Sequence, residues 1–171
     1  MTLRDCLLGV LVVGAVYTDL RLRRIPNRLL LPFLLLGVFV NTWVAGWSGL
    51  LDSLAGSGLG LLLLLLPYLA GGIGGGDVKF LATVGALTGP VFIWRAFLAG
   101  AIAGGVLSLV QLAFQGRLLQ VLKRVGFWLW QVVTPGMEPA TLENLESDRK
   151  WGKLPYAVPL SIGVLVSRLW L

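Results

Sequence analysis

Residues 54–79 read LAGSGLGLLLLLLPYLAGGIGGGDVK, and this stretch decides the fold. It contains six consecutive leucines, Leu61–Leu66, within an apolar segment that approaches the roughly 20 residues a helix needs to cross a bilayer core. The segment runs into 71–76, where five of six residues are glycine. Each glycine costs a helix about 1 kcal/mol relative to alanine. We therefore expect a helix over 54–70, a glycine-rich break, and a new helix from near Asp77.

The composition of the whole chain agrees with a membrane location. Of its 171 residues, 57% are hydrophobic and 13% are charged, whereas soluble domains carry about 25% charged residues. A small soluble protein could not hide this much apolar surface, so the lipid bilayer is an expected partner. The net charge of +6 fits basic loops retained in the cytoplasm. Nucleic-acid binding is not expected, because no basic patch interleaves with aromatic residues.

Apolar runs on either side of the opening stretch predict an all-α, polytopic membrane protein with about six transmembrane helices. We treat residues 1–171 as a single membrane domain. Its cytoplasmic part, about 116–153, would hold an interfacial amphipathic helix over 117–133 and a solvated loop. The expected spans are 3–18, 28–45, 54–70, 77 to the Gly89-Pro90 break or on to Trp94, 96–114 and 154–171, with an outer turn over 46–53 and Arg95 at the outer boundary.

The arginines after the first apolar run set the expected orientation. They follow the run, whereas a signal peptide carries its positive charge before the apolar core. We therefore expect a retained first helix, an outer N-terminus and a cytoplasmic loop, which Asn27 would end as the N-cap of the next helix. Trp43 and Trp47 fit the aromatic belt at the far interface. The four arginines are Arg21, Arg23, Arg24 and Arg28.

The chain has no histidine and one cysteine, Cys6. These counts exclude Ser-His and Cys-His nucleophile pairs, the HExxH zinc helix and an internal disulfide. No metal or cofactor is expected. Acid–base chemistry near neutral pH must therefore come from carboxylates, lysines or tyrosines.

Asp19 and Asp77 are predicted to lie at the same, cytoplasmic face of the membrane, at the end of one helix and the start of another. Each has a simpler interpretation: Asp19 could pair with Arg23 four residues on, and Asp77 could be an N-cap. Neither accounts for the glycines directly before Asp77. Two carboxylates held close share one proton, so one can activate water while the other donates to the developing oxyanion. This chemistry is aspartyl proteolysis.

Three motifs carry a resemblance to a known family. They are Thr18-Asp19-Leu20-Arg21 with Ile25-Pro26-Asn27, Gly74-Gly75-Gly76-Asp77-Val78-Lys79-Phe80, and Lys153-Leu154-Pro155-Tyr156-Ala157-Val158-Pro159. Together they resemble the type IV prepilin peptidase family of GxGD-type intramembrane aspartyl proteases, in its compact form without the cysteine-containing segment.

The resemblance implies that Asp19 and Asp77 are the catalytic pair. The implied activity removes a short basic leader from prepilin-like proteins (type IV pilin, Flp pilin or preflagellin) at the cytoplasmic face of the cell inner membrane. N-methylation is not expected, because the paired cysteines are missing. Where the closing motif often has phenylalanine-glycine, this chain has Tyr156-Ala157.

The residues around Asp77 suggest how a substrate would reach the site. Gly74, Gly75 and Gly76 would let a substrate strand approach closely, and Lys79 would hold the substrate or lower the pKa of one aspartate. A simpler interpretation makes Lys79 a membrane anchor.

Two other functions stay open at this point. One is a non-catalytic membrane component of a pilus or secretion apparatus. The other is a small ion-coupled transporter, although such proteins place acids near the midplane of their spans.

Overall fold

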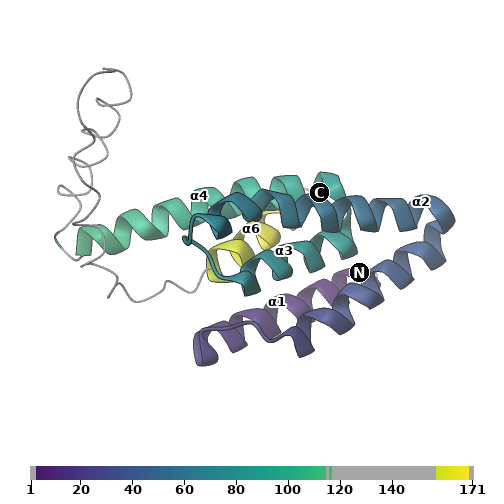
Figure 1. Cartoon of the computed structure of the whole chain (residues 1–171), viewed down its shortest axis with the longest axis horizontal. Helices are drawn as coiled ribbons and strands as arrows, with labels where there is room; N and C mark the ends of the chain where they lie inside the picture. Colours follow the sequence, from purple (N-terminus) through teal and green to yellow (C-terminus); the bar gives the residue numbers. More distant parts are fainter. Residues whose placement is uncertain (1–2, 115, 117–156, 170–171) are drawn as a thin grey trace, which may run out of the picture. The chain divides into compact units, whose positions relative to one another are not determined.

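The computed structural model describes residues 3–114, 116 and 157–169, and every element within these ranges is an α-helix (Figure 1). The all-α prediction is therefore confirmed for this part of the chain. The predicted amphipathic helix over 117–133 and the loop after it lie outside the described residues. The helices are α1 (Leu3–Leu22), α2 (Asn27–Leu69), α3 (Gly75–Thr88), α4 (Pro90–Phe114) and α6 (Ala157–Leu169).

The chain divides into two compact units. One comprises Met1–Gly104 and Pro155–Leu171, and the other comprises Gly105–Leu154. The second unit contributes the last turns of α4, whose large apolar side chains are exposed, Phe114 most of all. The helices and contacts described below belong to the first unit.

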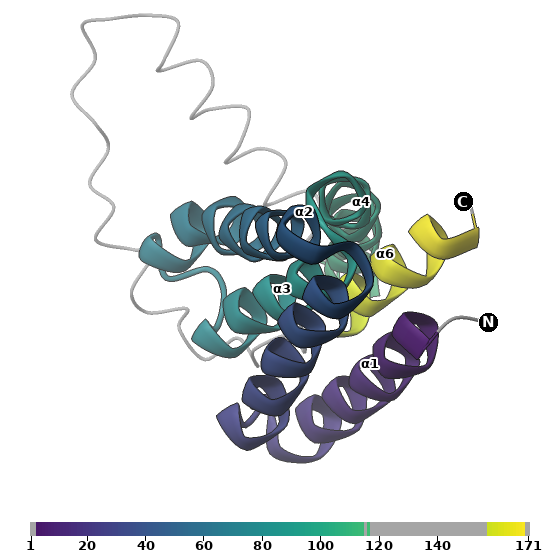
Figure 2. The same cartoon turned by 90° about the vertical axis from the view of Figure 1, so that its right-hand side faces the viewer.

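A bend at Gly46 turns α2 back on itself (Figures 1 and 2). Gly46 has φ 61° and ψ −137°, a conformation that glycine adopts without the steric cost of a Cβ atom. The bend separates a first arm, 27–45, from a second arm, 47–69. The predicted outer turn over 46–53 is therefore wrong in extent, because residues 47–53 are already helical. Trp43 and Trp47 flank the bend and are 81% and 73% exposed.

The start of α2 also differs from the prediction. Pro26, with φ −72° and ψ 141°, is the N-cap, and its side chain makes no capping hydrogen bond. Asn27 is the first helical residue, so its predicted role as the N-cap is wrong. Proline is well suited to helix starts because its fixed φ matches the helix and its missing N–H would be unpaired there.

Small residues let α3 pack closely against both arms of α2. A Cβ atom on Gly56 would overlap the carbonyl of Gly85, and one on Gly60 would lie 2.6 Å from the carbonyl oxygen of Leu81. On the first arm, a Cβ on Gly37 would lie 3.1 Å from the Ala86 backbone. Such contacts between small residues are the usual way in which membrane helices approach each other. As a result, α3 is buried from Asp77 to Leu87, except for Lys79.

Asn41 ties the end of α3 to both arms of α2. Its Nδ2 lies 2.8 Å from the Ser53 hydroxyl, 2.9 Å from the Ala86 carbonyl oxygen and 3.3 Å from the Leu87 carbonyl oxygen. Carbonyls in the last turn of a helix have no partner within the helix. The amide of Asn41 therefore satisfies acceptors that apolar packing alone would leave without hydrogen bonds.

Gly89 separates α3 from α4. It has φ 84°, and α4 begins at the next residue, Pro90. Of the two predicted ends for this helix, the Gly89-Pro90 break is confirmed and the extension to Trp94 is wrong. Arg95, predicted at a boundary, is an exposed residue within α4. A proline in the first turn of a helix leaves no hydrogen bond unmade, which is why the new helix can start there.

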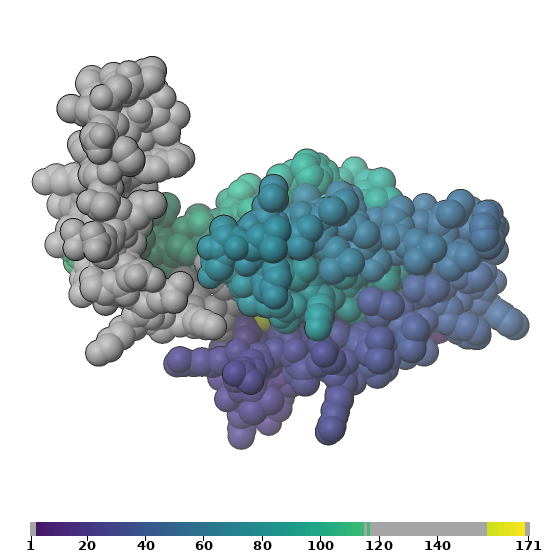
Figure 3. All heavy atoms as spheres, in the orientation of Figure 1, coloured from purple at the N-terminus to yellow at the C-terminus, as the bar shows by residue number. Residues whose placement is uncertain are grey.

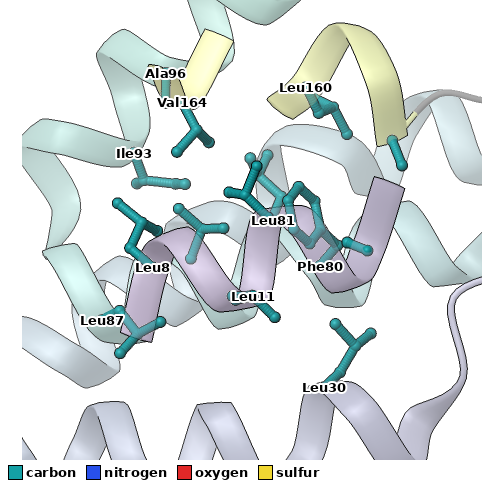
Figure 4. Close-up of a cluster of buried hydrophobic side chains, with 14 of the residues drawn as sticks. Leu8, Leu11, Leu30, Phe80, Leu81, Leu87, Ile93, Ala96, Leu160 and Val164 are labelled. Carbon is teal, nitrogen blue, oxygen red and sulfur yellow. The ribbon is translucent and has the colours of Figure 1, made fainter. Parts of the chain in front are cut away.

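The core collects apolar side chains from all five helices. Figure 4 shows Leu8 and Leu11 of α1, Phe80, Leu81 and Leu87 of α3, Ile93 of α4 and Leu160 and Val164 of α6 pointing toward one another. On another side, α6 lies so close to α4 that a Cβ on Gly163 would overlap the backbone at Ala96 and Gly100. Through these contacts α6 joins the same core as α1 and α3, although it follows them in sequence by many residues.

Two of the described helices, α2 and α4, are long and apolar enough to cross a membrane. Many large apolar side chains of the first unit are exposed, including those on the arms of α2, part of whose surface is visible in Figure 3. Lipid contact accounts for such a surface. The predicted number of six membrane crossings stays a prediction.

Candidate active site

Asp19 and Asp77 are the buried acidic side chains of the described residues, 6% and 8% exposed. Asp19 lies in the last turn of α1, and Asp77 lies in the first turn of α3. A buried carboxylate is costly unless it is paired or protonated. The contacts of both side chains therefore indicate how the protein keeps them there.

The Asp19 carboxylate is bound by the start of α6. The backbone N–H of Ala157 donates to Asp19 Oδ2 at 3.2 Å. Ala157 is the first residue of α6, where N–H groups lack partners within the helix and the helix dipole favours negative charge. Arg23, the partner of Asp19 in the simpler interpretation, is exposed, and its backbone N–H donates to the Asp19 carbonyl oxygen at 2.8 Å. No motif predicted this role of Ala157, because the two residues are 138 positions apart.

Asp77 stabilises the start of its own helix from the third helical position. Gly74 is the N-cap of α3, and its N–H donates to Asp77 Oδ2 at 3.3 Å. The simpler interpretation of Asp77 as the N-cap is therefore wrong by three residues. Glycine has no side chain to return the bond, so only the acidic half of a capping box is present. The helix also starts two residues earlier than predicted, at Gly75.

The charge of Asp19 affects the ionisation of Asp77. Both lie outside α2 and α4, the two candidate membrane spans. Burial and the nearby negative charge of Asp19 raise the pKa of Asp77 to about 6, against a smaller opposing effect of the Gly74 N–H. Burial also raises the pKa of Asp19, and the Ala157 N–H partly offsets this. A pair of this kind can hold one proton between two carboxylates, which general acid–base catalysis at a carbonyl requires.

The four residues expected to contact a substrate, Gly74, Gly75, Gly76 and Lys79, differ in exposure and in the atoms that they contact. Gly74 is exposed, whereas a Cβ on Gly75 would lie 3.4 Å from the Tyr68 ring. A Cβ on Gly76 would lie 3.3 Å from the backbone nitrogen of Ile25.

The last of these residues, Lys79, is exposed, and its Nζ donates to Asn27 Oδ1 at 3.2 Å. Gly76 and Lys79 thus contact this chain itself, on either side of Asp77, and Gly74 and Lys79 are the exposed members of the set. Among the described residues, no cluster of three or more potential metal ligands occurs.

Comparison with known proteins gives two matches. The Type IV leader peptidase family matches residues 6–109, a range that contains both aspartates. The chain is 32% identical over 102 residues to the prepilin leader peptidase/N-methyltransferase of Bacillus subtilis (strain 168). That match covers 58% of this chain and 40% of the relative, so the chain spans less than half of the length of this curated protein. No solved structure matches.

Proposed function

Because the chain belongs to the Type IV leader peptidase family, we propose that it is an aspartic-type endopeptidase of the membrane. Its substrates would be prepilin-like proteins, from which it removes the leader peptide. The prepilin leader peptidase to which the chain is similar supports this substrate class. The name of that relative also includes N-methyltransferase, but the match covers only 40% of its length. We therefore propose leader cleavage alone for this chain.

The observation that carries this proposal is the buried pair of Asp19 and Asp77. The two carboxyl groups come from different helices, and Asp19 is close enough to raise the pKa of Asp77. In the singly protonated pair, the ionised carboxylate takes a proton from a water molecule as the oxygen of that water attacks the scissile carbonyl. The protonated carboxyl donates a hydrogen bond to the carbonyl oxygen as it gains negative charge. When the C–N bond breaks, a proton passes to the leaving amine, and the pair recovers its single proton.

Several features support a cytoplasmic location for this site. Arg21, Arg23 and Arg24 directly follow Asp19, and all three are exposed. Basic residues at helix ends are retained on the cytoplasmic side of the membrane. In our proposal the protein is a multi-pass component of the inner, cytoplasmic membrane with the aspartates at its cytoplasmic surface. The two arms of α2 would then be separate crossings that meet at Gly46 on the outer side.

A substrate would approach this pair past the start of α3. Gly74 is exposed and directly precedes the helix that carries Asp77. Glycine at this position lets an extended peptide lie close to the backbone. Gly75, which packs against Tyr68, would lie beneath the bound peptide at the same place.

Co-expression with a candidate prepilin tests the proposal, with leader removal followed by a gel shift. Asp19→Asn and Asp77→Asn should each abolish cleavage while leaving the protein in the membrane. Asp52→Asn, which removes an exposed carboxylate of α2, is the matched control and should cleave normally. Cleavage that survives the loss of either buried aspartate refutes the dyad. Failure of the unaltered protein to cleave prepilins encoded near it would favour a structural role in a pilus or secretion apparatus, or ion-coupled transport.

A further inference from the structure

The connection between α1 and α2 contacts α3 on both sides of Asp77. We define connection 23–27 as residues 23–26 together with Asn27, the first residue of α2. A Cβ atom on Gly76 would lie 3.3 Å from the Ile25 nitrogen and 3.5 Å from the Ile25 oxygen, so the two backbones nearly touch. Three residues further along α3, Lys79 Nζ donates to Asn27 Oδ1 at 3.2 Å. The Gly76 contact lies one residue before Asp77 in the sequence, and the Lys79 contact lies two residues after it.

The same connection is also attached to the turn that carries Asp19. The Arg23 N–H donates to the Asp19 carbonyl oxygen at 2.8 Å, and Arg23 then leaves the helix with φ 51°. Two residues later the Ile25 side chain is 6% exposed, in the same core as Val78 of α3. Connection 23–27 therefore joins the two aspartate-bearing turns through short contacts at each end.

We propose that Asn27 and Lys79 are positioning residues, which together with the Gly76–Ile25 contact hold Asp19 and Asp77 at the separation that the dyad requires. This inference rests on the proposed peptidase function. A misplacement of about 1 Å can cost a catalytic group on the order of 100-fold in rate. The energy with which two carboxylates share a proton also depends on their separation. A contact on either side of Asp77 restrains both the position and the tilt of the first turn of α3.

The chemistry of the pair favours positioning over recognition of a charged substrate. Asn27 is neutral, so its oxygen orients the Lys79 ammonium without cancelling its charge. An ammonium is a compact donor on a flexible stem, and one directional acceptor fixes where it points. The contact also crosses 52 sequence positions, from the start of α2 to α3. If Lys79 served substrate binding instead, losing Asn27 would have little effect on the chemical step.

Steady-state kinetics of the purified protein in detergent, with a prepilin that it cleaves, distinguish these roles. Asn27→Ala should lower kcat by about 3- to 10-fold, as expected for one lost hydrogen bond, with KM unchanged. Asn27→Asp keeps an oxygen acceptor for Lys79 and should recover most of the rate. Arg28→Ala removes the exposed side chain next to Asn27 and is the matched control.

A double-variant cycle then asks whether the two residues act as one unit. Lys79→Met should lower kcat, and adding Asn27→Ala to it should cause no further loss. Two effects that multiply in the double variant would overturn the pairing. A rise in KM with kcat unchanged in Lys79→Met would equally overturn it, because that result marks a substrate contact.

Gly76→Ala tests the backbone contact separately. The new methyl group would lie 3.3 Å from the Ile25 nitrogen and should push connection 23–27 away from α3, lowering kcat. Alanine favours a helix over glycine by about 1 kcal/mol, so a loss of activity without a loss of thermal stability would exclude simple unfolding. Gly72→Ala, where the nearest atom is the Pro67 oxygen at 3.5 Å, is the control. Equal activities of the two variants would overturn this part of the proposal.

A measurement without catalysis keeps this inference separate from the proposed function. Asp19 from α1 and the Gly74 N–H face Asp77, while Lys79 of the same helix is directed to Asn27. If Asn27→Ala lets the aspartates separate, the pH at which thermal stability responds to Asp77 should move down. An inactive unaltered protein would reject the peptidase function alone. The positioning role would be rejected, whatever the activity, if the pH midpoint of this change in thermal stability were the same in Asn27→Ala and in the unaltered protein.

Discussion

Replacing Asp77 by asparagine should make the protein more stable at alkaline pH, although it should destroy the proposed activity. Burial and the charge of Asp19 raise the pKa of Asp77 to about 6, from an ordinary value of 3.8. The folded state therefore holds this proton more tightly than the unfolded state does. Stability is highest while the carboxyl is protonated, and it is lost as the pH rises through about 6. Asparagine is neutral throughout, and its oxygen can still accept from the Gly74 N–H.

The size of the effect follows from the two pKa values. At 1.36 kcal/mol per pKa unit, the difference corresponds to about 3 kcal/mol that ionised Asp77 costs the folded state. A chain of this length changes its Tm by about 2–4 °C per kcal/mol. Asp77→Asn should thus melt several degrees above the unaltered protein near pH 8, and the gap should nearly close near pH 4.

Thermal unfolding in detergent, followed by intrinsic tryptophan fluorescence across this pH range, measures the gap directly. Asp52→Asn removes an exposed carboxylate and controls for the loss of one negative charge. The reasoning is refuted if the Tm of Asp77→Asn exceeds that of the unaltered protein by the same amount at both pH values. A lower Tm for Asp77→Asn near pH 8 would refute it more strongly, since an ionised Asp77 would then stabilise the fold.

Three further outcomes are expected. The rate of leader cleavage should fall as the pH rises above about 6, because Asp77 then loses the proton that the pair needs. Initial rates measured between pH 5 and 9 check this expectation. A rate that does not change over this range contradicts it. Gly56→Ala should lower the Tm, because its methyl group meets the Gly85 carbonyl, whereas Gly58→Ala, with open space around it, should not. Asn41→Leu should cost about 1–3 kcal/mol of stability by leaving buried carbonyls unpaired, measured against Thr42→Val, whose hydroxyl bonds only its own helix.

The sequence predicts best what depends on local composition. The glycine-rich break, the helix start near Asp77 and the Gly89-Pro90 boundary all follow from glycine and proline chemistry, and the structure has them within a few residues. The two aspartates stand out because acids are scarce in an apolar chain. The sequence predicts their location at two helix ends but not their burial, because Asp52, from the same small set of acids, is exposed.

Other features depend on contacts that no local pattern contains. The bend of α2 takes one residue, Gly46, rather than the eight of the predicted turn, because residues 47–53 continue as a helix that packs Gly49 and Ser53 against Asn41 of the first arm. Asn27 has the residue type of an N-cap, but Pro26 already occupies that position and the Asn27 amide is free for Lys79. The bond from Ala157 to Asp19 joins α6 to α1 across 138 sequence positions. Only the packing of α6 between α1 and α4 creates it.

The bond between Ala157 and Asp19 also has a consequence in time. A ribosome makes α1 early and α6 late, so a growing chain carries both aspartates long before the N–H that orients one of them exists. Until α6 packs, Asp19 lacks the backbone N–H that binds its carboxylate, so the aspartate pair that we propose as the dyad is incomplete until then.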